Sequence, residues 1–230
     1  MNFLVIGSGA REHVIAQKLS ESGVTVFSVL TNRNPGMMKL SREFIFVNNY
    51  QNSLKVIVDF ALLKEVSCVV IGPEDPLSLG FSDAFWKKGI PVVGPLRLLA
   101  QIETSKGFTR DLLNKNGIDI SPQYQRFESI NGVEDFFSFL SGEYVVKYDG
   151  LMGGKGVKVS GEHLMSVDDG IAYCKELIDK GGSFVIEEKL TGEEFSLMSF
   201  CDGRNVAHMP AVQDHKRAYE GDTGPNTGGK

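Results

Sequence analysis

A glycine-rich segment next to lysines is the first feature of the sequence that points to chemistry. Lys147 ends an apolar run, and the segment Asp149-Gly-Leu-Met-Gly-Gly-Lys-Gly156 follows directly. Glycines allow the backbone to approach a ligand closely, and main-chain amides beside a lysine suit the phosphates of ATP. The segment is not a Walker A loop, because Asp149 stands in place of the first glycine and Gly156 follows Lys155 where serine or threonine is required. A plain hairpin turn is the alternative interpretation.

A second glycine turn follows the first apolar run of the chain. The segment Val5-Ile-Gly-Ser-Gly-Ala-Arg-Glu-His13 predicts a strand, a turn and a helix, and the amides at such a helix start can hold an anion. Two features depart from a dinucleotide fingerprint. Glu12 takes the place of its third glycine, and Leu30-Thr-Asn-Arg-Asn34 offers no acidic residue for a ribose hydroxyl. A phosphorylated small molecule therefore fits better than NAD, and a turn needed only for packing is the alternative.

Acidic side chains follow two of the predicted strands. The segment Gly72-Pro-Glu-Asp-Pro-Leu77 lies at the carboxyl end of a predicted parallel strand, which is the edge where open α/β sheets bind ligands. Glu74 is the candidate for recognising a hydroxyl or an amine, whereas Asp75 could instead cap the next helix. Val185-Ile-Glu-Glu188 and Gly192-Glu-Glu194 bring further carboxylates, which can accept from an adenine amino group and from ribose hydroxyls. A solvated run of charges is the alternative for these carboxylates.

The last motifs combine charged side chains with a loop of amides. They are Gln213-Asp-His-Lys-Arg217 and Gly224-Pro-Asn-Thr-Gly-Gly229. His215 is a candidate general base, although a lone histidine beside Asp214 is more often structural, and a surface turn is a further alternative. The sequence stops at Lys230 with no element after this glycine-rich loop, so we expect a truncation or a gene boundary there.

The elements that carry these motifs follow from the hydrophobic pattern. Apolar runs alternate with amphipathic stretches from residue 2 to about residue 95, which predicts a parallel α/β sheet. Residues 97–116 are mainly helical in pattern, and a smaller α+β unit comes next. The strands predicted in that unit are 144–148, 157–160 and 183–188, with a helix at 167–179 and then two antiparallel strands at 193–201 and 205–209.

The bulk composition excludes several classes of protein. A formal net charge of -5 and a sequence pI near 5.5 argue against a nucleic-acid partner, which would favour a basic face. The first apolar run, Phe3 to Ile6, is too short for a signal peptide or a membrane span. Three cysteines without metal-type spacing predict neither a disulfide framework nor a zinc site, and a reducing cytoplasm fits best.

Taken in order, these motifs closely resemble those of the phosphoribosylamine-glycine ligase family of ATP-grasp enzymes, also called glycinamide ribonucleotide synthetases. The motif Lys-Tyr-Asp-Gly-Leu-Met-Gly-Gly-Lys-Gly-Val and the later Ile-Glu-Glu belong to it, and the resemblance spans the whole chain. It implies an α/β fold in which a parallel-sheet amino-terminal domain precedes an ATP-grasp α+β lid domain and the incomplete start of the next ATP-grasp domain. The implied parts are a substrate-binding domain at 1–100, a helical connection at 101–120, the lid subdomain at 121–190 and the start of the catalytic subdomain at 191–230.

The resemblance also implies a reaction, in which ATP phosphorylates glycine and 5-phosphoribosylamine attacks the glycyl phosphate. The products are glycinamide ribonucleotide, ADP and phosphate, and the cofactors are ATP with Mg²⁺ or Mn²⁺. The implied ATP-binding residues are Lys106, Lys147, Gly153, Gly154, Lys155, Glu187, Glu188 and Glu194. The implied substrate-binding residues are Gly7, Gly9, Glu74, Asp214, Lys216, Asn226 and Thr227, and the catalytic ones are Lys155, Asp214 and Lys216.

The family pattern continues Gly-Gly-Met-Gly after Asn-Thr, whereas this sequence has Lys230 and stops. Because the family's metal ligands lie further downstream, we expect none in this chain, and we expect the chain alone to be inactive without a separate or missing carboxyl-terminal half. Two other hypotheses remain. One is a different ATP-grasp enzyme of purine metabolism, such as a carboxylase or formyltransferase, and the other is a non-catalytic ATP-binding module.

Overall fold

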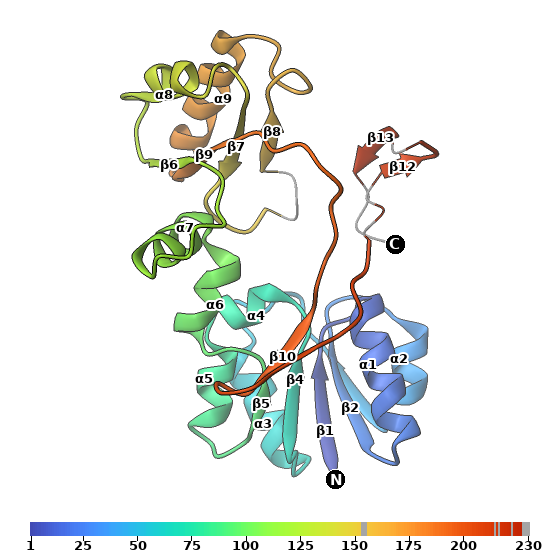
Figure 1. The fold of residues 1–230 in the computed structure, drawn as a ribbon. Coiled ribbons are helices and arrows are strands. Elements are labelled where there is room, and N and C mark those ends of the chain that lie inside the picture. The colour runs from blue at the N-terminus through green and yellow to red at the C-terminus, as the bar shows by residue number, and fades with distance from the viewer. Residues whose placement is uncertain (153–155, 214, 216, 222, 227–230) are drawn as a thin grey trace. The chain divides into compact units, whose positions relative to one another are not determined.

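The chain forms two compact units, Met1–Leu112 and Leu113–Lys230. The computed structural model describes residues 1–152, 156–213, 215, 217–221 and 223–226 (Figure 1). The domain boundaries expected at residues 100, 120 and 190 stay predictions. None of the helices in the described part of the chain is long and apolar enough to cross a membrane.

The first unit is built on a five-stranded parallel sheet with the strand order β3-β2-β1-β4-β5 (Figure 1). Its central strands are mainly apolar and largely buried, as is usual for parallel sheets that are covered on both faces. The parallel sheet predicted from the sequence is therefore confirmed. The strands are β1 Asn2–Ile6, β2 Thr25–Leu30, β3 Glu43–Phe46, β4 Cys68–Ile71 and β5 Val92–Val93.

Helices cover both faces of this sheet. Val5 packs on one face with Ala16 of α1 and Met37 of α2, while Leu4 packs on the other with residues of α3 and α5. The loop after β1 therefore leads to one face and the loop after β4 to the other. Since β1 and β4 are neighbours and their loops leave toward opposite faces, an open α/β sheet is expected to have its binding crevice between these two loops. The helices of this part of the chain are α1 Ala10–Glu21, α2 Pro35–Leu40, α3 Leu54–Leu63, α4 Glu74–Ser78, α5 Phe81–Trp86, α6 Arg97–Thr104 and α7 Lys106–Lys115, and α7 continues past the boundary at Leu112.

The second unit contains a four-stranded antiparallel sheet with the order β6-β9-β7-β8. Two helices cover one face and form a single apolar core with it, which includes Phe137, Tyr144, Leu177 and Phe184 (Figure 1). The predicted hairpin-plus-helix unit is confirmed. The elements are β6 Tyr124–Phe127, α8 Val133–Phe139, β7 Tyr144–Tyr148, β8 Val157–Val159, α9 Val167–Asp179 and β9 Phe184–Glu188.

Two short hairpins follow in the sequence. The strands β10 Ser199–Cys201 and β11 Val206–His208 pair antiparallel, as predicted, but β10 is shorter than the predicted strand 193–201. The strands β12 Arg217–Tyr219 and β13 Thr223–Asn226 also pair, so the prediction of a loop is wrong for residues 224–226. A strand can contain glycine and proline here because both strands of a two-stranded sheet are edge strands.

Candidate functional site

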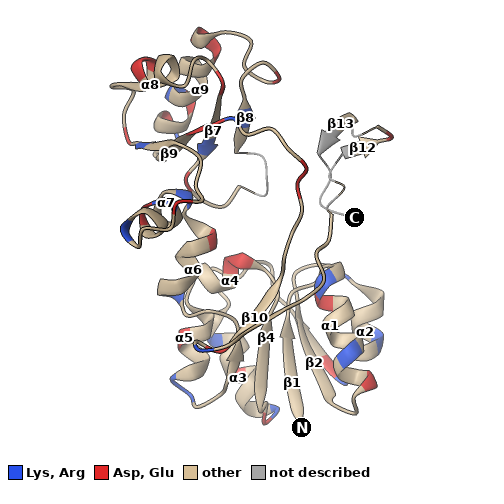
Figure 2. Ribbon diagram, in the orientation of Figure 1, with Lys and Arg blue, Asp and Glu red and all other residues tan. Residues whose placement is uncertain are grey.

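The predicted substrate-binding residues of the first unit lie at the carboxyl edge of its sheet. Gly7 and Gly9 follow β1, and Glu74 begins α4 after β4. The last residues of β1 and β4 are directly paired, so both loops leave the sheet at the same edge. Figure 2 marks the acidic start of α4 in red. The structure thus places these three residues beside the expected crevice.

Glu12 also lies at this edge, at the position where a dinucleotide fingerprint has its third glycine. Its side chain is buried, and its Oε2 accepts a 2.6 Å hydrogen bond from the backbone N–H of Gly9, the N-cap of α1. A Cβ on Gly72, after β4, would come within 2.1 Å of the other carboxylate oxygen. The spacing of a capping box, with a glutamate three residues after the cap, was the signal in the sequence. Because Glu12 uses the Gly9 amide, the anion site predicted at this helix start lacks that donor.

The turn after β1 is held by polar side chains that follow β2. Ser8 Oγ and Thr31 Oγ1 are 3.0 Å apart, and Asn34 Nδ2 donates to the Ser8 carbonyl at 3.0 Å. Asn34 Oδ1 also accepts from the Met37 N–H at 3.1 Å and so caps α2. Residues 30–34 offer no acidic residue for a ribose hydroxyl. Their polar side chains instead hold the glycine turn after β1 in place.

Tyr50 brings a fourth loop, the one after β3, to the same edge. Burial raises the pKa of its hydroxyl, a hydrogen bond with Thr31 lowers the pKa, and the charges of Glu12 and Asp75 raise it further. Asp75 lies in the first turn of α4, whose N-cap is Pro73, so the alternative in which Asp75 caps this helix is wrong. A carboxylate in a first turn is still favourable, because it faces the positive end of the helix dipole.

In the second unit, a buried ion pair lies on the sheet face opposite the helices. Lys147 Nζ on β7 contacts Glu187 Oε2 on β9 at 2.5 Å, and the glutamate side chain is 1% exposed. Both face away from the core because they alternate with the core residues Val146 and Ile186. Figure 2 shows the positive charge on β7. The structure thus brings together two of the predicted ATP-binding residues.

The start of the glycine-rich segment is tightly packed. The carboxylate of Asp149 is 2% exposed and lies 3.3 Å from Arg126 Nε, while the Asp149 N–H donates to the Ser183 carbonyl at 2.9 Å. A Cβ on Gly150 would come within 2.5 Å of the Tyr148 ring. At least one of the glycines is therefore required by packing, in addition to any role in binding.

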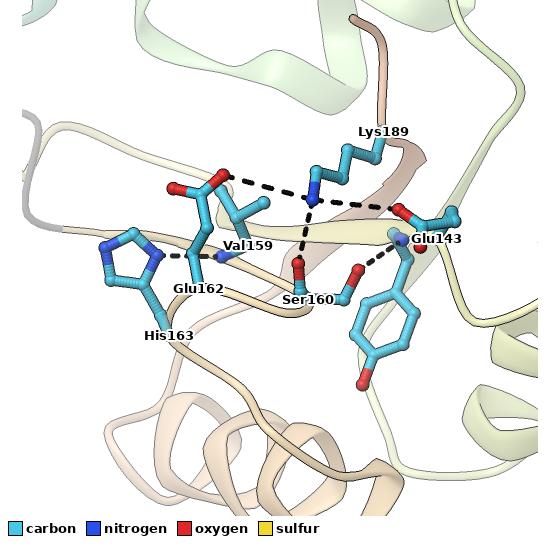
Figure 3. A network of polar contacts seen from close by, with 7 residues as sticks. Glu143, Val159, Ser160, Glu162, His163 and Lys189 are labelled. Carbon is cyan, nitrogen blue, oxygen red and sulfur yellow. Dashed lines mark hydrogen bonds and ion pairs between the residues drawn. The ribbon is translucent and has the colours of Figure 1, made fainter. Parts of the chain in front are cut away.

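Lys189 fastens the end of β9 to the turn after β8. Its Nζ donates to the Ser160 carbonyl at 3.1 Å and lies 3.6 Å from Glu143 Oε2 and 3.9 Å from Glu162 Oε1 (Figure 3). Glu188, the residue before it, accepts from the Gln123 N–H at 3.3 Å. These contacts hold the strand end that carries the predicted carboxylates.

Several further predicted residues belong to other parts of the chain. Lys106 begins α7 in the other unit, Glu194 is exposed in the segment between β9 and β10, and His215 is exposed. Asn226 ends β13. The predicted residues that lie outside the described part of the chain are Gly153, Gly154, Lys155, Asp214, Lys216 and Thr227. Within the described ranges, no three His, Cys, Asp or Glu side chains are grouped so that they could hold a metal ion.

A parallel α/β unit followed by an antiparallel lid with a glycine-rich hairpin defines an ATP-grasp protein. Two family models cover the whole chain. The N domain of phosphoribosylglycinamide synthetase matches residues 1–103, and the ATP-grasp (A) domain of the same family matches residues 104–230. The chain belongs to the phosphoribosylglycinamide synthetase family.

Relatives and solved structures agree with this assignment. The chain is 44% identical over 231 residues to the phosphoribosylamine-glycine ligase of Methanosarcina barkeri and 47% identical over 237 residues to that of Methanococcus maripaludis. All of the chain is matched, and it spans about half the length of these relatives, 52% and 53%.

The crystal structure of the Thermotoga maritima phosphoribosylamine-glycine ligase is 29% identical and superposes with a TM-score of 0.80 over 100% of this chain and 54% of that one. An ADP complex of N5-carboxyaminoimidazole ribonucleotide synthetase, 16% identical, shares the fold with a TM-score of 0.73 over 96% of this chain and 55% of that one.

Proposed function

We propose that this chain supplies the ATP-binding lid and a substrate-binding domain of a ligase that joins glycine to 5-phosphoribosylamine. The observation that carries the proposal is the match of both domains to a single ligase family over all 230 residues. The buried pair of Lys147 and Glu187 supports it, because it places a fixed lysine beside the glycine-rich hairpin.

The proposed chemistry proceeds in two steps. A carboxylate oxygen of glycine attacks the γ-phosphorus of ATP, which releases ADP and forms glycyl phosphate. The amine of 5-phosphoribosylamine then attacks the carbonyl carbon, so that a C–N bond forms, phosphate leaves and the amine loses a proton. Catalysis of such transfers is mostly positioning and charge stabilisation.

The residues of this chain have separate parts in this scheme. We assign the phosphates of ATP to Lys147, Lys106 and the hairpin with Lys155, and adenine and ribose to Glu187, Glu188 and Glu194. Phosphoribosylamine and glycine are assigned to Gly7, Gly9, Glu74 and the motif residues Asp214, Lys216, Asn226 and Thr227. A divalent cation would neutralise charge on the transferred phosphoryl group. We assign no described residue to hold this cation. We propose that its ligands correspond to residues in the part of the relatives that this chain does not cover.

Lys147 is assigned a direct role with the phosphates, so its replacement should abolish the reaction. Because the same replacement also destabilises the fold, circular dichroism must show that each variant is folded under the conditions of the assay. The measurement is ADP release that depends on both glycine and 5-phosphoribosylamine, by this chain alone and mixed with the carboxyl-terminal half of the Methanosarcina barkeri relative. The matched control is Lys180→Met, because Lys180 pairs with Glu176 on the exposed side of α9.

Activity in the mixture that Lys147→Met abolishes and Lys180→Met leaves unchanged would support the proposal. Activity with a different amine or carboxylate would instead identify another ATP-grasp enzyme of purine metabolism. ATP binding without any activity in the mixture would identify a non-catalytic module. The expected compartment of the reaction is the cytoplasm.

A further inference from the structure

Glu12 is a buried carboxylate against which three backbone segments are packed. The residue is 6% exposed. A Cβ on Gly7 would lie 2.4 Å from its Cγ, one on Gly9 would lie 2.9 Å from its Oε2, and one on Gly72 would lie 2.1 Å from its Oε1. Real side-chain contacts are longer than this, so each of the three positions excludes a side chain while Glu12 keeps its conformation.

Helix capping explains only part of this arrangement. The hydrogen bond from the Gly9 N–H satisfies one donor at the start of α1 and uses one carboxylate oxygen. Gly72 belongs to a different loop, which follows β4 and leads to the opposite face of the sheet. The other oxygen faces that loop, so the carboxylate lies between the turn after β1 and the turn after β4.

We propose that Glu12 is a positioning residue that sets the spacing of the turns after β1 and β4 and thereby orients the substrate group bound between them. This inference rests on the proposed function, in which Gly7, Gly9 and Glu74 bind 5-phosphoribosylamine. Because protein interiors are closely packed, a displacement of the Glu12 side chain would displace both turns. An error of about 1 Å in a positioned group can cost as much as 100-fold in rate.

The test separates the geometry of Glu12 from its charge. Glu12→Gln keeps the length of the side chain and an oxygen that accepts from the Gly9 N–H, whereas Glu12→Ala removes the side chain beyond Cβ. The probe is ribose 5-phosphate, measured by titration calorimetry on the full chain, and ATP is titrated separately into each variant. We expect Glu12→Ala to weaken ribose 5-phosphate binding by ~10-fold or more and Glu12→Gln to weaken it by less than ~3-fold, with ATP affinity unchanged in both.

Substitution of the facing glycine tests the same contact from the other side. Gly72 does not have a positive φ, so Gly72→Ala is allowed by the backbone, and its Cβ would displace the Glu12 carboxylate. We expect a loss of affinity similar to that of Glu12→Ala, and we expect the double variant to be no worse than Glu12→Ala alone. The matched control is Gly36→Ala in α2. Its Cβ would come within 2.1 Å of the ring of His13, which lies next to Glu12 in α1, and Glu12 is not among the nearest atoms.

The outcomes distinguish this inference from the proposed function. Unchanged ribose 5-phosphate affinity in Glu12→Ala would overturn the positioning role alone. Equal losses in Glu12→Gln and Glu12→Ala would also overturn it, because the charge and not the geometry would then matter. A loss in Gly36→Ala as large as that in Gly72→Ala would show general loosening of α1 and overturn it too. Absence of binding to the unchanged chain, with ATP still bound, would overturn both the inference and the substrate assignment of this unit.

Discussion

Lys147 and Glu187 form an ion pair between the neighbouring strands β7 and β9, on the sheet face opposite the helices. The two side chains differ in burial, since the glutamate is 1% exposed and the lysine 26%. A carboxylate this deeply buried depends on its partners, because an uncompensated charge in a protein interior is costly. The pair therefore links the stability of the lid to a residue assigned to ATP.

Lys147→Met should lower the free energy of unfolding by about 3 kcal/mol, because it leaves the buried Glu187 carboxylate without its lysine. The double variant Lys147→Met/Glu187→Leu should recover most of that loss. Urea denaturation followed by circular dichroism measures both. The exposed pair of Lys180 and Glu176 is the control, and its removal should cost less than about 0.5 kcal/mol. Equal losses of stability at the two pairs would contradict the explanation that the burial of Glu187 makes its ion pair important for stability.

Gly170→Ala should destabilise the second unit although it lies in a helix. Alanine is favoured over glycine by about 1 kcal/mol in helices. At Gly170 of α9, however, a Cβ would lie 2.5 Å from the Tyr144 hydroxyl and 2.8 Å from the Phe137 ring, and these rings are stacked. Overpacking of this kind costs about 1–3 kcal/mol, so we expect a net loss in chemical denaturation.

Tyr144→Phe removes the hydroxyl that Gly170→Ala would meet first, so the double variant should regain part of the loss. A Gly170→Ala variant more stable than the unchanged chain would show that the rings move aside without cost.

Two of the three cysteines, Cys174 and Cys201, should react with thiol reagents at very different rates. Burial raises the pKa of the Cys174 thiol to about 12, so almost no thiolate is present in the folded protein at pH 8. Cys201 on β10 is exposed. We expect Cys201 to be labelled within minutes by an aromatic disulfide reagent and Cys174 only on unfolding, with Cys174→Ser and Cys201→Ser variants to assign the two phases. Labelling of Cys174 at the rate of Cys201 would contradict the burial.

The same shift in pKa gives a dependence of stability on pH. Because the folded-state pKa of Cys174 is above the ordinary value of 9, the folded state keeps its proton where the unfolded state loses it. This contribution to stability is complete below pH 9 and is lost as the pH rises toward 12. Cys174→Ser should flatten the pH dependence of the urea midpoint in that range, and an unchanged slope would argue against the assignment.

The turn between β10 and β11 should resist acid to about pH 2. The backbone N–H and side chain of Asn205 and the backbone N–H of Arg204 donate to the Asp202 carboxylate, which lowers its pKa to about 2 from 3.8. Since the folded pKa is lowered, the contribution to stability is present above pH 3.8 and is lost as the pH falls through about 2. The amide chemical shifts of Arg204 and Asn205 should titrate with that midpoint, and a midpoint near 3.8 would show that the bonds do not form in solution.

Much of the fold followed from local patterns. The strand Tyr144–Tyr148 and the helix Val167–Asp179 were predicted with their observed bounds, because each is a strong pattern between clear turn residues. Strands β3 and β6 were not predicted. Glu43–Phe46 is short and only partly buried, and Tyr124–Phe127 is polar, so their pairing with β2 and β9 comes from the tertiary structure.

The same division holds for the candidate site. The sequence motifs and the family resemblance selected Lys147 and Glu187, but strand register made them partners. Lys147 is directly opposite Val185, two residues along β9 from Glu187. Glu12 was visible in the sequence only as a departure from a glycine pattern. Its contact with Gly72 joins residues sixty positions apart, and no local propensity encodes that distance. The sequence by itself determined the family and the identities of these groups, whereas only the packed structure decided which of them touch, because burial and pairing depend on elements that meet after folding.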